Sequence, residues 1–101
     1  MKIVKLPQAL KDLVETADYL AQDDVEVADR FFDAFEATLE VIRKTPNIGS
    51  IRRFKNEIDI RMWFVRGFEK SLIFYTSNSE EIVILRIIHA ARDYTRFFGN
   101  D

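Results

Sequence analysis

The stretch that decides the fold is "IDIRMWFVRGFEKSLIFYTSNSEEIVILRIIH", residues 58–89, where three apolar runs are separated by two short polar turns. Residues 58–65 alternate in polarity, residues 70–77 are rich in β-branched and aromatic side chains, and residues 81–89 are apolar on both sides apart from Arg86. These patterns predict three strands, and the short turns predict antiparallel neighbours. The third run is expected in the interior of the sheet, because both of its sides must be covered.

The segments on either side of this stretch predict one more strand and two helices. Residues 2–6 read as a strand that stops at Pro7, a residue suited to the first turn of a helix. Apolar residues then recur at helical spacing up to Ala21, and Asp23 with Glu26 resembles the capping signal of a second helix. Residues 91–101 are expected to form a short terminal helix whose Phe97 and Phe98 pack back on the sheet. The prediction is an α+β fold in the order β-α-α-β-β-β, with a helical hairpin on one face of a small, mostly antiparallel sheet.

The size and composition of the chain predict one compact domain over residues 1–101. The sequence has no Cys and one His, so a disulfide framework and a zinc site are not expected, and no motif for a cofactor is present. The amino terminus lacks the apolar segment of a signal peptide, and no window is long enough to span a membrane. A cytoplasmic protein without cofactor or metal is therefore expected.

Charge is distributed unevenly along the chain. The net charge is −2, but residues 8–42 carry ten acids against two bases, and residues 43–70 carry eight bases against three acids. The folded protein should have an acidic side and a basic side. The simpler interpretation is that the protein has two solvated faces of opposite charge. The more specific interpretation is that the basic face binds an acidic partner or a nucleic acid.

Strand alternation assigns the polar strand residues to faces of the sheet. Placing Ile58, Ile60, Met62 and Phe64 under the helices leaves an open face that carries a mixture typical of protein-binding surfaces: Arg61, Trp63, Ser71, Tyr75 and Arg86. The same alternation puts His89 on the helix-covered side, as a buried side chain with a local hydrogen bond. A catalytic triad of Ser71, His89 and Asp93 can be written down, but a triad is defined by geometry that a sequence does not give.

Three stretches of this chain resemble the toxins of the ParE/RelE superfamily. "LPQALKDLVETADYLAQDD" (6–24) is similar to their first helix, and "ADRFFDAFEATLEVIRKTPNIGS" (28–50) to their second helix and its exit loop. "IRMWFVRGFEKSLIFYTSNSEEIVILRIIHAARDY" (60–94) resembles their strands and ends in His89-x-x-Arg92-Asp93. The resemblance covers nearly the whole chain and implies the toxin of a bacterial type II toxin–antitoxin pair, with the fold predicted above.

The resemblance implies one of two activities, because ParE-like members poison DNA gyrase and RelE-like members cleave messenger RNA on the ribosome. Arg61 and Arg92 match two cations of the nucleases. The middle-strand Arg falls at Ser71, a strand Lys falls at Asp59, and the terminal Tyr falls near Phe98, with Tyr94 offset. Because Ser71 replaces the middle-strand Arg of the nucleases, a phosphate transition state would lose its main stabilising cation. The ParE-like reading, a gyrase inhibitor that is not itself an enzyme, is therefore favoured.

The alternatives are a ribosome-dependent endoribonuclease that uses Arg61 and Arg92, and a non-toxic module that only binds an antitoxin. The expected partners are a cognate antitoxin and gyrase or another topoisomerase, with operator DNA reached only through the antitoxin and ribosome or message only in the nuclease alternative. The residues expected to bind the target or the antitoxin are Arg61, Trp63, Tyr75, Arg86 and Arg92. His89 and Asp93 are interpreted as a structural signature that holds the end of the last strand.

Overall fold

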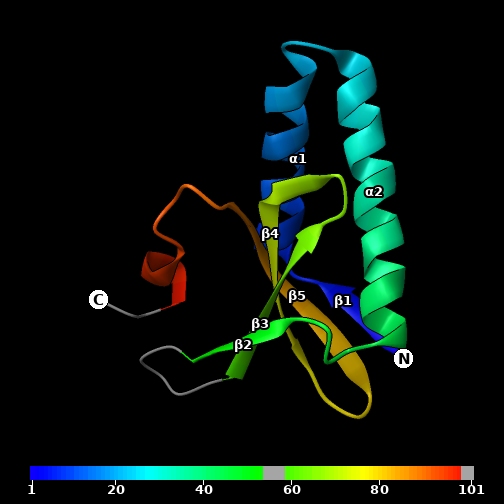
Figure 1. Ribbon diagram of the computed structural model, residues 1–101, viewed down its shortest axis with the longest axis vertical. Helices are drawn as coiled ribbons and strands as arrows, with labels where there is room; N and C mark the ends of the chain where they lie inside the picture. Colours follow the sequence, from blue (N-terminus) through cyan, green and yellow to red (C-terminus); the bar gives the residue numbers. More distant parts are fainter. Residues whose placement is uncertain (54–58, 99–101) are drawn as a thin grey trace.

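A computed structural model describes residues 1–53 and 59–98 of the chain (Figure 1). The elements, in order, are β1 (Lys2–Lys5), α1 (Pro7–Ala21), α2 (Val25–Lys44), β2 (Ser50–Arg53), β3 (Asp59–Val65), β4 (Phe68–Ser77), β5 (Glu81–His89) and the short 3-10 helix η1 (Tyr94–Phe98). The predicted α+β class and element order are confirmed, with one additional strand, β2, in the basic stretch between α2 and β3, where no strand was predicted. Ile58, expected to begin β3, lies outside the described residues, as do residues 99–101 of the expected terminal helix.

The two helices form an antiparallel hairpin because each has clear boundary signals. Pro7 occupies the first turn of α1, where no backbone donor is needed. Asp24 caps α2 by accepting a hydrogen bond from the Glu26 backbone N–H at 2.9 Å, one residue later than the Asp23 predicted for this role. Arg43 and Lys44 lie in the last turn of α2, next to the negative end of its dipole.

The five strands form a single sheet in the order β1-β5-β4-β3-β2. β1 runs parallel to β5, and every other pair is antiparallel, as the sequence predicted. β5 is an interior strand between β1 and β4, which explains why its sequence is apolar on both sides. Gly67 makes the tight turn between β3 and β4 with a φ of +85°, a conformation that other residues rarely adopt.

Side chains pack on both faces of the sheet, in two separate clusters. The helix-facing cluster joins the buried sides of α1 and α2 to the sheet and includes Phe31, Phe35, Ile42, Ile73, Tyr75, Ile84 and Ile87. On the opposite face, η1 folds back so that Phe98 packs with Ile60, Phe74 and Ile88. The Phe74 ring lies 5.0 Å from the ring centres of both Tyr94 and Phe98, so the expected packing of the terminal segment is confirmed for its described part.

The predicted face assignment is wrong for β3 and β4 and holds only in part for β5. In β3, the Trp63 and Val65 side chains pack toward the helices, whereas Ile60 and Met62 lie under η1. Trp63 and Tyr75 do share a face with Ile73, as alternation predicted, but it is the helix-covered face.

In β5, strict alternation would put Leu85, Ile87 and His89 on the helix-covered side, and the structure departs from this at Leu85, which packs under η1. Phe74 pairs with Arg86 and Tyr75 pairs with Ile84, so Leu85 is an extra residue in a β-bulge. A bulge breaks the two-residue alternation. Ile84 and Ile87 therefore both face the helices, while Leu85 and Ile88 face η1.

Among the described residues, no helix combines the length and the apolar composition that crossing a membrane would require.

Candidate functional site

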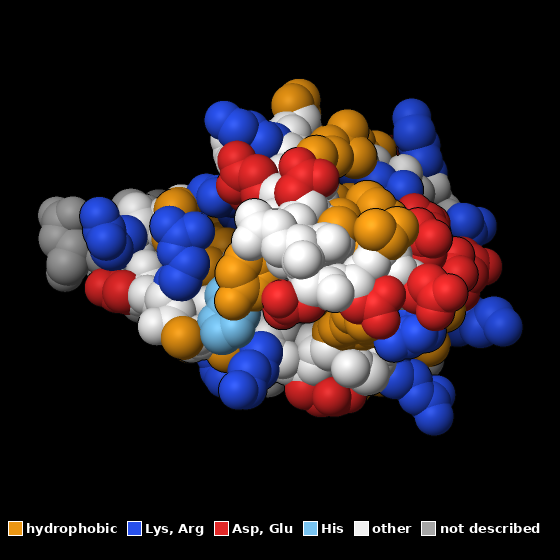
Figure 2. Space-filling model, turned by 90° about the horizontal axis from the view of Figure 1, so that it is seen from above, with side chains coloured by type: hydrophobic (Ala, Val, Ile, Leu, Met, Phe, Trp, Pro, Cys, Tyr) orange, Lys and Arg blue, Asp and Glu red, His pale blue; other side chains and the backbone are white. Residues whose placement is uncertain are grey.

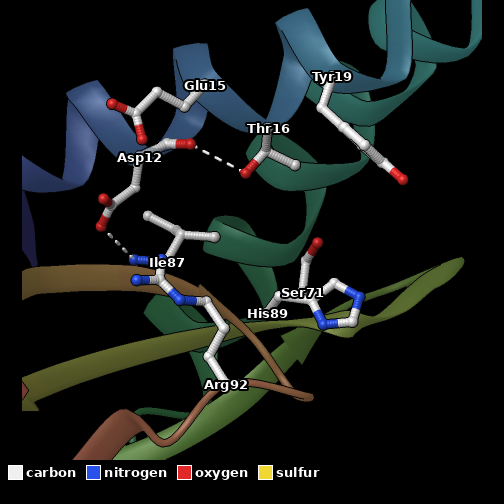
Figure 3. Close-up of a pocket in the computed structure, with 8 residues that line it drawn as sticks. All are labelled: Asp12, Glu15, Thr16, Tyr19, Ser71, Ile87, His89 and Arg92. Atoms are coloured by element: carbon white, nitrogen blue, oxygen red, sulfur yellow. Dashed lines mark hydrogen bonds between the residues drawn. The ribbon is translucent and has the colours of Figure 1, made fainter. Parts of the chain in front are cut away.

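A groove runs along α1 on the side of the sheet where β5 ends and β4 begins. Two adjoining hollows of about 400 and 430 Å³ form it and share the lining residues Thr16, Tyr19, Ser71 and His89. The first hollow extends toward Asp12, Ile87 and Arg92, and the second toward Gly67 and Lys70. Figure 3 shows the α1 side chains opposite Ser71 and His89 across this space. The sequence-predicted residues that line the groove are Ser71, His89 and Arg92.

Helical and strand periodicity place these side chains. Asp12, Glu15, Thr16 and Tyr19 stand at positions i, i+3, i+4 and i+7 of α1, so they form one stripe toward the groove. Ser71 and His89 face each other as a directly paired couple of β4 and β5. The groove therefore has one wall from a helix and one from the sheet.

His89 lies on the helix side of the sheet, as predicted, but it is exposed, and the prediction of a buried side chain is wrong. It occupies the last position of β5, where the groove separates it from α1. Figure 2 shows the ring at the surface, with Lys and Arg side chains to its left and below it.

The hydrogen bond of His89 argues against a catalytic triad. The Ala91 backbone N–H donates to Nδ1 at 3.0 Å, so this nitrogen carries no proton in the observed arrangement. A triad histidine donates its Nδ1–H to a carboxylate, which this arrangement does not permit. The bond closes the turn after β5, in agreement with a structural role. Asp93 is exposed in the same turn, directly before η1.

Arg92 and Arg86 both lie over the Phe97 ring. Their guanidinium carbons are 4.9 and 4.4 Å from its centre, distances at which a cation is attracted to an aromatic face. Arg92 is exposed and lines the groove. Phe97 thus holds a cation at the groove's edge and links that cation to η1.

Arg86 is committed to a buried ion pair that the sequence did not reveal. Its Nε donates to Asp12 Oδ2 at 2.8 Å and its Nη2 donates to Asp12 Oδ1 at 3.1 Å. Asp12 is 6% exposed, and it also accepts hydrogen bonds from the Ile87 backbone N–H at 3.0 Å and from Gln8 Nε2 at 3.1 Å. Arg86 therefore fastens β5 to α1, and only a small part of its side chain reaches solvent.

Arg61 and Tyr75 hold the loop between α2 and β2. Tyr75 Oη donates to the Pro46 carbonyl at 2.8 Å and accepts from the Gly49 N–H at 2.9 Å. Arg61 Nη1 donates to the Gly49 carbonyl at 2.7 Å and to the Asn47 carbonyl at 3.3 Å. Burial raises the pKa of Tyr75 above 10.0, partly offset by its hydrogen bond with Gly49 and by the charge of Arg61.

The residues predicted to form one binding surface are therefore dispersed. Tyr75 is fully buried, and Trp63 is half-buried and stacked on Phe64 at 4.5 Å between ring centres. Trp63 lines a different hollow, between α2 and β3. Of the proposed contact residues, Arg92 is the one that is both exposed and part of the groove.

Within residues 1–53 and 59–98, no group of three or more His, Cys, Asp or Glu side chains is arranged to hold a metal ion. No curated protein matches the sequence. A family model does match: the one described as the ParE toxin of the type II toxin–antitoxin system parDE, over residues 3–94. That match spans both helices, strands β2 to β5, all of β1 except its first residue, and the turn with His89 and Arg92. The chain belongs to the ParE toxins of type II toxin–antitoxin systems.

Proposed function

We propose that this toxin acts by binding DNA gyrase and inhibiting it, without cleaving a substrate itself, and that a cognate antitoxin neutralises it. The observation that carries the proposal is that Arg61 is bonded to a loop of its own chain. Arg61 is one of the two residues that match cations of the related nucleases. Its guanidinium is bonded to two loop carbonyls, with the shorter contact at 2.7 Å. Both bonds are donated by Nη1, so the loop takes two of the five guanidinium N–H donors and holds the charge of Arg61 in place.

The other positions of the nuclease pattern support the same proposal. Asp59 stands where the nucleases have a strand Lys, and it pairs with Arg53 at 2.9 Å. Ser71 provides a hydroxyl where they have an Arg. Tyr94 and Phe98 pack on Phe74, so both rings belong to the apolar cluster under η1. A phosphate transition state would meet a carboxylate and a hydroxyl where cations are needed.

Supercoiling and cleavage-complex assays with purified gyrase test the proposal. Inhibition that grows with toxin concentration and is reversed by the co-expressed antitoxin is expected. Gyrase that stays fully active at any excess of folded toxin would overturn the proposal.

One observation favours a second candidate, a ribosome-dependent endoribonuclease. Arg92, His89 and Ser71 line the same hollow, so a cation, an imidazole and a hydroxyl are exposed together. General acid–base chemistry needs such groups within hydrogen-bonding reach of a substrate. Primer extension on transcripts after induction separates the two candidates, because only a nuclease creates new message ends.

For the antitoxin we propose two modes of contact. β1 and β2 are the edge strands of the sheet, so their outer backbone groups can pair with an extended segment. The groove beside α1 fits the apolar side of a helix or the side chains of an extended segment, with Arg92 at its edge for an acidic residue. Calorimetry of Arg92→Ala against wild type tests the groove; an unchanged affinity would remove Arg92 from the antitoxin surface. A chain that binds antitoxin but leaves growth unaffected when induced alone would be the non-toxic module.

A further inference from the structure

The outer surface of the helical hairpin carries apolar side chains that remain partly exposed to solvent. On α1 and the residue before it, Leu6, Leu10 and Val14 recur every four residues and are 37%, 47% and 53% exposed. On α2, Val25 is 65% exposed and Phe32 is 40% exposed. Side chains four apart on a helix lie on one face, so Leu10 and Val14 form a stripe, and Leu6 directly precedes the helix that carries it.

The exposed residues of the two helices meet along the line where the helices pack. α1 ends at Ala21 and α2 begins at Val25, so Val14 and Phe32, each seven residues from the turn, lie at the same height along the hairpin. Lys5, next to Leu6, pairs with Glu36 at 2.8 Å, and Glu36 lies one turn beyond Phe32 on the same side of α2. This contact shows that the Phe32 side of α2 faces the start of α1. We call the surface formed by Leu6, Leu10, Val14 and Phe32 the hairpin seam.

Acidic side chains border the hairpin seam. Asp18 follows Val14 by one turn on α1, and Asp29 and Asp33 border Phe32 on α2; all three are exposed. Within the described part of the chain, none of the three is in an ion pair. Residues 8–42 carry a net charge of −8, and Figure 2 shows acidic side chains gathered over the helices. The seam is thus an apolar strip inside a negative field.

We propose that the hairpin seam docks on a cationic, partly apolar surface of the target enzyme. This inference rests on the proposed function and assigns a surface to it. A second copy of the chain is a poor occupant, because two such seams would bring like charges together. An enzyme that handles DNA neutralises phosphates with Lys and Arg, so a topoisomerase presents surfaces of the required charge. The seam and the groove with Arg92 lie on different sides of α1, so the two surfaces are separate.

Two pairs of variants test the seam, each matched for its change in charge. Val14→Lys puts a positive charge in the seam, and Val41→Lys makes the same change at a 39% exposed position on the other side of α2, beside Trp63. Asp29→Asn removes a negative charge at the seam, and Glu80→Gln removes one in the exposed turn between β4 and β5. All four side chains are exposed, so the variants should fold, which the melting temperature checks.

Binding to immobilised purified gyrase and inhibition of supercoiling are then measured for each variant. Val14→Lys should weaken binding at least about tenfold, because it puts a charge into a contact that loses its water on binding. Val41→Lys changes the net charge by the same amount outside the seam, so it should weaken binding less than about twofold. Asp29→Asn should weaken binding about threefold, in the range of single charge pairs, and Glu80→Gln should not. Equal effects within each pair of variants would overturn the proposal that the hairpin seam is the docking surface, while leaving gyrase as the target. Failure of wild type to bind gyrase would overturn the proposed function, and the seam assignment with it. Dimers of wild type that Val14→Lys dissociates would identify a second copy as the occupant and would also overturn the proposal.

Discussion

Replacing Asp12 with Ala should destabilise the fold far more than any exposed charge change. The carboxylate accepts four hydrogen bonds, two from Arg86, one from the Ile87 N–H and one from Gln8. Removing it leaves a buried N–H and a guanidinium whose side chain is 17% exposed without their acceptor. Breaking a buried ion pair costs about 3–5 kcal/mol, and the partial exposure of Arg86 favours the lower end, about 3 kcal/mol.

Urea denaturation followed by circular dichroism measures this loss. With an m value of about 1.5 kcal/mol/M, 3 kcal/mol lowers the midpoint by about 2 M. Glu40→Ala is the control: Glu40 pairs with Arg43 in an exposed i,i+3 contact, which is worth about 0.5 kcal/mol or less. Replacing both partners, as Asp12→Leu with Arg86→Met, should regain part of the loss because no unpaired charge stays behind. A loss below about 1 kcal/mol for Asp12→Ala would refute this account of the ion pair.

Three further predictions concern the loop between α2 and β2 and the terminal segment. Because the pKa of Tyr75 is raised in the folded state, its contribution to stability is complete below pH 10 and is lost as pH rises through the folded pKa. Tyr75→Phe should therefore be less stable than wild type at pH 7 but lose less stability above pH 10; parallel stability curves from pH 8 to 11 would contradict this. Gly49→Ala would place a Cβ 2.7 Å from Tyr75 Oη and should cost about 1–3 kcal/mol, unless denaturation shows that the loop shifts freely. Phe98→Ala removes a 9% exposed ring and should cost about 3 kcal/mol, whereas an unchanged midpoint would mean that η1 packs loosely.

Much of the fold could be predicted because local patterns agree with it. Helical spacing, Pro7 and a capping Asp predict the hairpin, and the apolar run of residues 81–89 predicts an interior strand. β2 was missed because residues 50–53, Ser-Ile-Arg-Arg, are polar, as edge strands often are. The choice between the two faces of β3 depends on which side the helices cover, and alternation alone does not determine it.

The site was harder to predict because it depends on contacts between distant segments. Asp12 is one of many acids in the helices, and its partner Arg86 is separated from it by 74 positions. A signal was nevertheless present, because Asp12 lies between Ala9 and Leu13 on the apolar stripe of α1. A carboxylate in such a stripe calls for a buried partner. The bulge at Leu85, which reverses the faces within β5, has no comparable signal in the sequence.

A toxin that binds a topoisomerase and a toxin that cleaves RNA have different effects in the cell. The most direct measurement is the linking number of a reporter plasmid, taken with transcript ends from the same cells, after the toxin is induced without its antitoxin. A toxin that inhibits gyrase should give a plasmid that loses negative supercoiling while messages keep their normal ends. Unchanged supercoiling together with new message ends would contradict the proposed inhibition of gyrase.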